Sequence, residues 1–462
     1  MKPGPRIAII GGGWAGLACA LALRRHGPRL DVFEASPLWG GRARAAHVRL
    51  ADREVTLDCG QHLLVGAYRA CLAQIAELGP DTAAKLRRQR LRLVSSAGLD
   101  LRRLALPGRA GLGAGLLLAR GLSVAEKLAA LRLMASLGAS DWRPPGAIAS
   151  VAELLAAHRQ PHRLVRRLWE PLCIGALNTA PEEACAASFA AVLRDTLGGP
   201  ADASDFLLPT APLADLLSTP AVDSLREAGV GLHPTHPVAS VVPEDGGWRL
   251  VMRGARLGPD HRYDHVVIAT DPLAAARLVD PLDAGCAQQL AGFGFTPIAT
   301  VYLGWHEPVS LPPAIMLDED REAGSPGQWL FDRGRQAELR IGAIVISARD
   351  RVGDLDAQAL GAATAAQVSR QLRLPPPAGI RVLTEQRATW RCTADRPRLA
   401  IDALADGAPG VWLAGDYLED DYPATLESAI RCGRRTAGLI STAILAGSPS
   451  GAGQGGAPQT VW

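Results

Sequence analysis

The chain has 462 residues, enough for roughly two or three domains and a large core. Its residues are 48% hydrophobic and 21% charged, which is ordinary for a globular enzyme. The formal charge of +3 is spread along the chain, so we expect no nucleic-acid partner.

The eight cysteines occur singly, without a CxxC pair or the Cys/His spacing of a zinc site. We therefore expect no disulfide framework, no bound metal and a reducing cytoplasmic location. The N-terminal apolar run is too short for a signal peptide. No stretch reaches the about eighteen uninterrupted apolar residues that a membrane span needs.

The opening of the chain predicts a β-α-β unit. A strand at 6–10 precedes a helix at 13–27, which Gly27 closes, and a second strand follows at 30–35. The intervening turn carries Gly11-x-Gly13-x-x-Gly16.

In this pattern, the first glycine permits a tight turn, the second lets the backbone approach a pyrophosphate, and the third lets helix and strand pack closely. The pyrophosphate then lies at the helix N-terminus, whose free N–H groups suit an anion. Glu34 closes the second strand, where its carboxylate can accept hydrogen bonds from the hydroxyls of an adenosine ribose. This unit predicts a dinucleotide site.

The next motif, "LDCGQHLLVGAY" at 57–68, sets a polar patch in an apolar segment. Asp58, Gln61 and His62 are crowded against Gly60. Buried polar groups without partners cost roughly 1–3 kcal/mol each, so this patch indicates either a bound partner or a core histidine that is hydrogen-bonded within the protein.

The middle of the chain predicts an inserted unit. Residues 85–225 have a mostly helical pattern with proline-rich breaks at 144–145 and 209–220. The most apolar part, 109–139, predicts either one or two core helices, or an apolar surface that dips into a membrane or lines an apolar channel.

The remainder mixes strands and helices. A hairpin turn is predicted at Asp245-Gly246-Gly247. The predicted elements after it are a strand at 263–270, antiparallel strands within 296–350, one helix, strands near 380–390 and 410–416, a helix at about 424–445, and a disordered tail at 448–462.

These patterns predict an α/β protein in which one domain is assembled from separated segments. We expect a cofactor domain from 1–84, 226–292 and 400–447. Residues 85–225 and 293–399 form an inserted α+β substrate domain with a mixed or antiparallel sheet and apolar helices.

Two further motifs indicate which dinucleotide binds. Gly40-Gly41-Arg42 offers a flexible loop and a fixed charge, and Gly415-Asp416 follows a buried strand. Together with the N-terminal glycines, they resemble FAD proteins of the glutathione-reductase type, in the amine oxidase and phytoene desaturase branch. That resemblance implies a Rossmann-like FAD domain in which residues 58–62 pass beside the flavin ring.

A closer resemblance rests on "DCGQHLLVGAY" and "LAGDYLEDDYPATLESAIRCGRRTAG", with "TEQRATW" and "WEPLCIGALNT" in support. These stretches are similar to the hydroxysqualene dehydroxylases, also called squalene-associated FAD-dependent desaturases. The chain departs from that family at Cys59, where asparagine is usual, and in the acidic run 419–421. The resemblance covers all but the tail.

The resemblance implies reductive removal of the hydroxyl of hydroxysqualene, giving squalene, with reduced FAD as hydride donor. An allylic hydroxide leaves poorly unless it is protonated, so a general acid is needed near the flavin. His62 is the first candidate, since an unperturbed imidazole titrates near pH 6.5, with Tyr68 and Asp58 as alternatives. The dipole of the last helix would favour negative charge on the reduced flavin.

The resemblance also implies a set of cofactor-binding residues. They are Gly11, Gly13, Ala15, Gly16, Glu34, Ala35, Gly41, Arg42, Gly60, Gln61, His62, Val238, Ala269, Gly415, Asp416, Ala424 and Thr425.

Two other functions remain open at this point. One is a desaturase or oxidase of another polyisoprenoid, and the other is a prenyl-binding escort protein of the GDP-dissociation-inhibitor type. No second strand–GxGxxG–helix unit occurs, so the electron donor is unidentified. We expect a cytoplasmic protein, peripheral on the inner face of the cell membrane.

Overall fold

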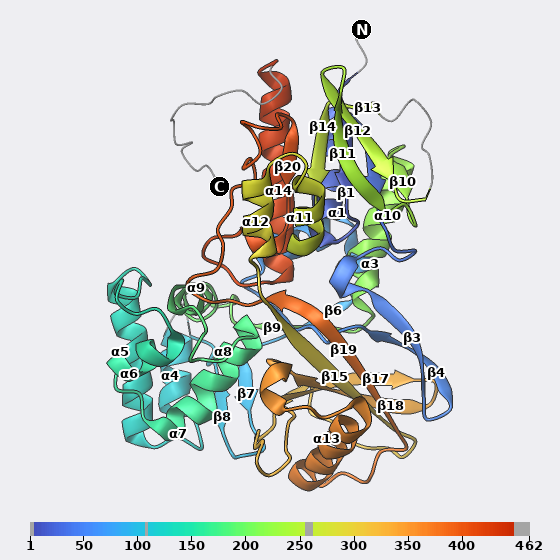
Figure 1. Cartoon of the computed structure of the whole chain (residues 1–462). Helices are drawn as coiled ribbons and strands as arrows, with labels where there is room; N and C mark the ends of the chain where they lie inside the picture. The colour runs from blue at the N-terminus through green and yellow to red at the C-terminus, as the bar shows by residue number, and fades with distance from the viewer. Residues whose placement is uncertain (1–3, 107–109, 255–261, 448–462) are drawn as a thin grey trace.

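The computed structural model describes residues 4–106, 110–254 and 262–447. The predicted disordered tail, 448–462, lies outside the described residues. Figure 1 shows a unit built around a parallel sheet at the top, a group of helices at lower left and an antiparallel sheet at lower right.

The parallel sheet has five strands in the order β10-β2-β1-β14-β20. All four pairings are parallel, and β14 and β20 are buried throughout, as such sheets require. Its strands come from three distant parts of the chain, which confirms the predicted Rossmann-like domain built from separated segments. The strands are β10 (Gly231–His233), β2 (Arg29–Phe33), β1 (Arg6–Ile10), β14 (His265–Ile268) and β20 (Val411–Leu413).

Helices α1 (Trp14–Leu23) and α14 (Leu426–Leu445) pack closely together beside this sheet. A Cβ at Gly433 would lie 2.2 Å from the Ala15 carbonyl oxygen, so only glycine allows this approach. Helix α10 (Ser218–Glu227) also packs on α1 and leads into β10.

A three-stranded antiparallel sheet contacts β1 and β14. The predicted hairpin turn is confirmed, because Asp245 and Gly246 have φ of 43° and 79°. The strands are β11 (Val238–Glu244), β12 (Gly247–Met252) and β13 (Arg262–Tyr263), and the helix pair α11 (Pro272–Val279) and α12 (Ala284–Ala291) follows.

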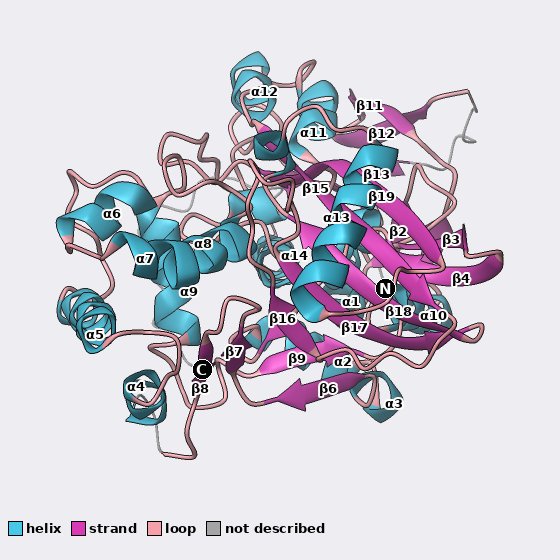
Figure 2. Ribbon diagram, turned by 90° about the horizontal axis from the view of Figure 1, so that it is seen from below, coloured by secondary structure: helices cyan, strands magenta, loops and turns pink. Residues whose placement is uncertain are grey.

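The predicted antiparallel strands form a second five-stranded sheet in the order β16-β17-β18-β15-β19. Helix α13 (Ala357–Leu372) packs against β15 and β19, as Figure 2 shows from below. The strands are β16 (Ala314–Met316), β17 (Trp329–Gln336), β18 (Leu339–Ile346), β15 (Phe295–Trp305) and β19 (Gly379–Trp390).

The inserted helices gather away from both large sheets (Figure 1). Ser123 with Glu126, and Ser150 with Glu153, form capping boxes that fix where α5 and α6 begin. The helices are α4 (Ala110–Leu117), α5 (Val124–Ala139), α6 (Val151–Ala157), α7 (His162–Leu164), α8 (Glu170–Leu177), with a π-helical turn at Val165–Trp169 before it, and α9 (Ala186–Thr196). Among the described residues, no helix combines the length and apolar character needed to cross a membrane.

The mostly helical pattern predicted for 85–225 is wrong at both ends of that range, where short strands occur. Each of the strands at 92–94 and 100–102 has one buried leucine next to a charged residue, a pattern too short to stand out from the sequence. The remaining elements are β3 (Ala45–Leu50), β4 (Arg53–Asp58), β5 (Leu64–Val65), α2 (Arg69–Glu77), α3 (Pro80–Ala83), β6 (Leu86–Gln89), β7 (Arg92–Val94), β8 (Asp100–Arg102) and β9 (Phe206–Pro209).

Candidate functional site

The three glycines after β1 have three different environments. Gly11 has φ of +115°, and Gly16 packs so closely that a Cβ there would lie 2.0 Å from the Gly11 carbonyl oxygen. A Cβ at Gly13, in contrast, would meet no atom of the described residues within 4 Å. The turn therefore has room for a ligand at Gly13 and at neither of the other two positions.

Glu34 follows β2 and is oriented by two backbone groups. Its carboxylate accepts hydrogen bonds from the N–H of Gly12 at 2.7 Å and of Ser36 at 2.8 Å. Trp39 covers Gly12, where a Cβ would collide with the indole at 2.3 Å. Glu34 is half-buried and the neighbouring Ala35 is exposed, so the carboxylate lies at the rim of the glycine turn.

The other predicted backbone contacts come from the same region. Ala269 follows β14, and its N–H donates to the Ile10 carbonyl at 2.8 Å, which sets it beside Gly11. Ala15 is buried in the first turn of α1, and Val238 is half-buried at the start of β11.

Arg42 and Asp416, predicted separately as cofactor ligands, contact each other. The Arg42 guanidinium lies 2.6 Å from the Asp416 carboxylate and also donates to the Ala388 carbonyl at 2.8 Å. Burial opposes its charge, but Asp416 keeps the pKa of Arg42 above its ordinary value. Gly40 and Gly41, with φ of 106° and 59°, form the turn that carries this arginine next to Gly13.

The segment Gly60-Gln61-His62 carries a buried polar atom, the Oε1 of Gln61, that has no partner within the described part of the chain. The Gln61 amide donates to the His62 carbonyl at 2.8 Å, and the His62 Nδ1 lies 2.7 Å from the Gly60 carbonyl oxygen. The buried Oε1 of Gln61 accepts no hydrogen bond from the described part of the chain. This oxygen is therefore able to accept a hydrogen bond from a ligand.

His62 differs from the unperturbed imidazole that its sequence suggested. Burial lowers its pKa first; Asp58 and the bond to Gly60 oppose this, while the nearby guanidinium groups of Arg42 and Arg333 add to it. Since Nδ1 donates its proton to Gly60, Nε2 is the nitrogen left for other chemistry. Near neutral pH the imidazole is mostly uncharged.

Asp58 is nearly inaccessible, and both of its carboxylate oxygens have partners. One accepts from the Leu213 N–H at 2.8 Å and the other from Arg333 at 3.1 Å. The side chains of this ion pair are 1% and 7% exposed. The hydroxyl of Tyr302 donates to the Asp58 carbonyl at 2.9 Å. Burial raises the pKa of Asp58, while Arg333 and the Leu213 N–H oppose the rise. Because both carboxylate oxygens are already bound to these groups, the contacts favour an anchor over a proton donor.

Tyr68 lies among different groups from His62. Burial raises its pKa well above its ordinary value, with Tyr422, Cys71 and Glu427 as further contributors. None of these groups is among those that shift His62. The structure therefore brings Asp58 and His62 together and sets Tyr68 next to the start of α14.

The last helix begins where Thr425 caps it, accepting a hydrogen bond from the Ser428 N–H at 3.1 Å. Glu427, fully buried, accepts from the N–H groups of Ala70 and Cys71 at the start of α2, at 3.1 and 2.8 Å. The segment that contains Ala424 is thereby tied to the segment that follows His62.

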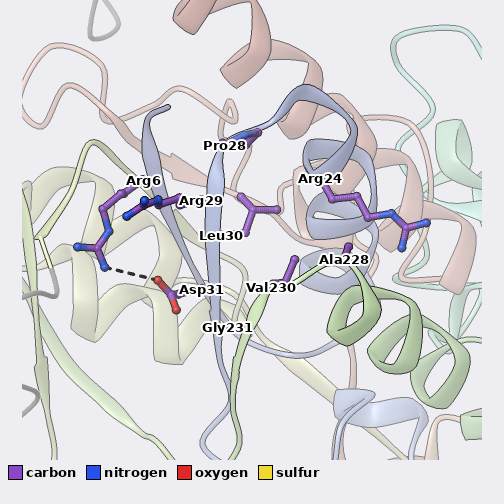
Figure 3. Close-up of a pocket in the computed structure, with 10 residues that line it drawn as sticks. Arg6, Arg24, Pro28, Arg29, Leu30, Asp31, Ala228, Val230 and Gly231 are labelled. Carbon is purple, nitrogen blue, oxygen red and sulfur yellow. Dashed lines mark ion pairs between the residues drawn. The ribbon is translucent and has the colours of Figure 1, made fainter. Parts of the chain in front are cut away.

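Figure 3 shows a separate pocket of about 450 Å³, and it is not this site. Arg6, Arg29 and Gly231 line it at the amino ends of β1, β2 and β10, whereas the glycine turn follows the carboxyl end of β1. A five-residue strand separates the two ends by about 17 Å. Ligands of parallel sheets bind at the carboxyl ends.

Sequence reasoning missed Arg333, Tyr302 and the Leu213 N–H. Tyr302 had a usable signal, because a tyrosine inside an apolar strand needs a partner for its hydroxyl. Arg333 had none, since the sequence does not distinguish one buried arginine from the exposed ones.

Comparison with known proteins agrees with this geometry. The family model of flavin-containing amine oxidoreductases matches residues 14–441. The chain belongs to the flavin-containing amine oxidoreductase family. It is an FAD-dependent oxidoreductase, which sets aside the non-catalytic escort function.

Individual relatives extend the comparison. The chain is 27% identical to the hydroxysqualene dehydroxylase of Rhodopseudomonas palustris, over 95% of this chain and 98% of that protein. It is 26% identical to the carotenoid phi-ring synthase of Streptomyces griseus, over 91% and 84%. The structure of cyclohexylamine oxidase from Brevibacterium oxydans shares the fold, with a TM-score of 0.67, 20% identity and coverage of 96% and 100%. The resemblance to hydroxysqualene dehydroxylases is confirmed.

The described residues fit FAD. The space at Gly13 and the oriented carboxylate of Glu34 suit the diphosphate and ribose, and the unpartnered Gln61 Oε1 suits an N–H donor. FAD is the cofactor of this enzyme.

Proposed function

We propose that the chain catalyses the FAD-dependent conversion of hydroxysqualene to squalene. The observation that carries this proposal is the match to a hydroxysqualene dehydroxylase over 95% of the chain. When bound, reduced FAD supplies the hydride that replaces the hydroxyl.

We propose that His62 handles the proton. Its Nδ1 is held by Gly60, so a second proton on Nε2 is free to pass to the leaving hydroxyl, which departs as water. Asp58 and Tyr68 remain to be tested beside it, but the two partners of Asp58 favour a supporting role. The seventeen residues named above as cofactor ligands are our proposal for the FAD site.

The decisive experiment is anaerobic incubation of the protein with chemically reduced flavin and hydroxysqualene. We expect squalene to form, detected by gas chromatography with mass spectrometry, in amounts that follow the FAD content. The oxidised protein serves as the control. Intact hydroxysqualene in the presence of fully reduced, FAD-loaded protein would refute the proposal.

A second candidate is a desaturase or oxidase of another polyisoprenoid, in which hydride leaves the substrate. The match to the carotenoid phi-ring synthase of Streptomyces griseus favours it. The same incubation distinguishes the two, because a desaturase leaves hydroxysqualene unchanged and converts its own substrate only when the flavin starts oxidised.

We also propose a membrane contact through the turn between α4 and α5, residues 117–124. Leu117, Leu118 and Val124 are 51%, 68% and 72% exposed there. Lys127 donates to the Leu117 carbonyl at 2.8 Å, which brings a positive charge to the same turn. Exposed leucines beside a lysine suit the surface of an anionic bilayer, where a lipid-soluble substrate is found.

The partners and the domain division are proposals of the same kind. We propose that the substrate is a polyisoprenoid, that a separate electron donor reduces the flavin, and that the protein acts in the cytoplasm at the inner face of the membrane. We propose that residues 85–225 and 293–399 form the substrate domain.

A further inference from the structure

The segment that carries His62 is held by a residue far away in the sequence. Arg333, on β17, is 7% exposed and lies 3.1 Å from the Asp58 carboxylate. Its other nitrogen donates to the Pro209 carbonyl at 3.0 Å. Leu213, in the loop after Pro209, donates its N–H to the other Asp58 oxygen at 2.8 Å. One guanidinium therefore joins β17, the end of β4 and the loop over 209–213.

This arrangement has the form of a clamp. A planar guanidinium donates in fixed directions, so it orients its acceptors more strictly than a lysine would. Asp58 is also fixed through its carbonyl by Tyr302. Only three residues separate Asp58 from His62, and Nδ1 of His62 bonds back to Gly60 between them.

We infer that Arg333 is a positioning residue, which fixes the segment presenting His62 by holding Asp58 and the 209–213 loop. The inference rests on the proposed function only for its effect on turnover. The role is separate from catalysis, because Arg333 acts through Asp58.

Electrostatics gives the clamp a measurable effect on His62. The charged groups that act on the imidazole are Asp58 on β4, Arg42 in the turn after Gly41, and Arg333 on β17. Arg333 lowers the pKa of His62 and Asp58 raises it. Burial raises the pKa of Asp58, and Arg333 opposes that rise. Removing Arg333 takes away a positive charge that lowers the pKa of His62, which favours the protonated imidazole.

The test is a histidine titration of the FAD-loaded protein by NMR, with isotope-labelled histidine and with His62 assigned from His62→Gln. In Arg333→Met we expect the pKa of His62 to rise by about one unit or more. The Nδ1–H tautomer of the wild-type protein should give way to a mixture of tautomers.

Breaking a buried ion pair is destabilising, so three further variants accompany Arg333→Met. Asp58→Asn leaves Arg333 near the imidazole and should lower the pKa of His62. The double variant Asp58→Asn with Arg333→Met leaves no unpaired buried charge. In it, the rise in the pKa of His62 expected for Arg333→Met should be abolished. Arg333→Lys should keep the pKa but loosen the tautomer preference.

Arg340→Met is the matched control, because Arg340 pairs with Asp332 in the same antiparallel sheet, with side chains 26% and 11% exposed. Arg340→Met should leave the pKa and the tautomer of His62 unchanged. An unaltered His62 pKa and tautomer in the Arg333 and Asp58 variants would overturn the inference.

Turnover separates this inference from the proposed function. Activity that needs protonated His62 falls as pH rises through its pKa, so in Arg333→Met the fall should move to higher pH. A shifted titration without squalene formation in any protein would sink the proposed reaction and leave the clamp standing. If squalene forms but the pKa of His62 does not shift in the Arg333 and Asp58 variants, the proposed reaction stands and the role of Arg333 is refuted.

Discussion

Glu34, our proposed ligand of the FAD ribose, shows how backbone groups orient a single side chain. The Gly12 and Ser36 N–H groups orient its carboxylate before FAD binds. Glu34→Ala removes an acceptor of charge-assisted hydrogen bonds, each worth about 1.5–3 kcal/mol. Since each 1.4 kcal/mol is tenfold, we expect FAD affinity to fall by about 10-fold to 100-fold in a flavin titration.

Glu54→Ala is the control for this variant, because Glu54 is exposed on β4. It should bind FAD as the wild-type protein does. Equal FAD affinity in both variants would show that the ribose is held by another residue.

His62→Ala tests the proposed proton donor. Loss of a general acid costs about 10²–10⁴-fold in rate, so turnover should fall by that factor while FAD content and thermal unfolding stay near wild type. Tyr68→Phe should have a small effect, since burial keeps its phenol neutral and its neighbours lie at α14. Near-normal turnover in His62→Ala would make the histidine structural.

For single residues, the sequence predicts those properties that depend only on neighbouring residues in the chain. The turn that contains Gly11, Gly13 and Gly16 could be predicted because its pattern spans only six positions, and the structure gives the three glycines the different environments described above. The lowered pKa of His62 could not, since it depends on Arg42 and Arg333, which only the fold brings near.

At the scale of elements, the turn between β1 and α1 offers a matched pair of substitutions. Gly13→Ala places a methyl group where no described atom lies within 4 Å, so the protein should fold normally. That methyl would occupy the space proposed for the diphosphate, so FAD binding should weaken strongly. Flavin absorbance after gel filtration measures this.

Gly16→Ala, in contrast to Gly13→Ala, should lower the stability of the fold itself. Its Cβ would lie 2.0 Å from the Gly11 carbonyl oxygen, which forces α1 away from β1. Overpacking of this kind costs about 1–3 kcal/mol, so the thermal midpoint should drop even in samples without FAD. Equal thermal midpoints for the two variants would contradict this assignment.

Elements were predictable where their periodicity was long. The buried strand at 6–10 and the helix ending at Leu445 could be located to within two residues, because apolar runs and helical spacing persist over their length. The two-residue β5 could not, since it exists only by pairing with β9, some 140 positions away.

At the scale of the whole molecule, the sequence predicted which segments build the parallel sheet, and not how the inserted units meet it. Asn178 illustrates the difference: its amide donates to the Thr296 carbonyl and to Thr389, and its oxygen accepts from the Ala348 N–H. This one side chain joins α8 to β15, β19 and the end of β18. Nothing in the sequence marks it as a junction.

The proposed membrane contact also belongs to the whole molecule, because it depends on which surface the helices leave exposed. Burying a leucine or valine side chain is worth about 1.5–3 kcal/mol. Leu118→Ser with Val124→Ser should therefore reduce binding to anionic liposomes by at least about 100-fold, measured by flotation. FAD content should be unchanged, since the turn at 117–124 is remote in sequence from every proposed cofactor ligand.

Leu355→Ser with Ile380→Ser is the control, because these side chains are 38% and 43% exposed outside that turn. This variant should float with the liposomes as the wild-type protein does, and mild detergent should release both, as expected for interfacial binding without a membrane span. Raising the salt concentration should weaken flotation if Lys127 contributes, because charge attraction to lipid is screened. If the Leu118 and Val124 variant floats as well as the control, residues 117–124 do not bind the membrane, and their leucines need another explanation.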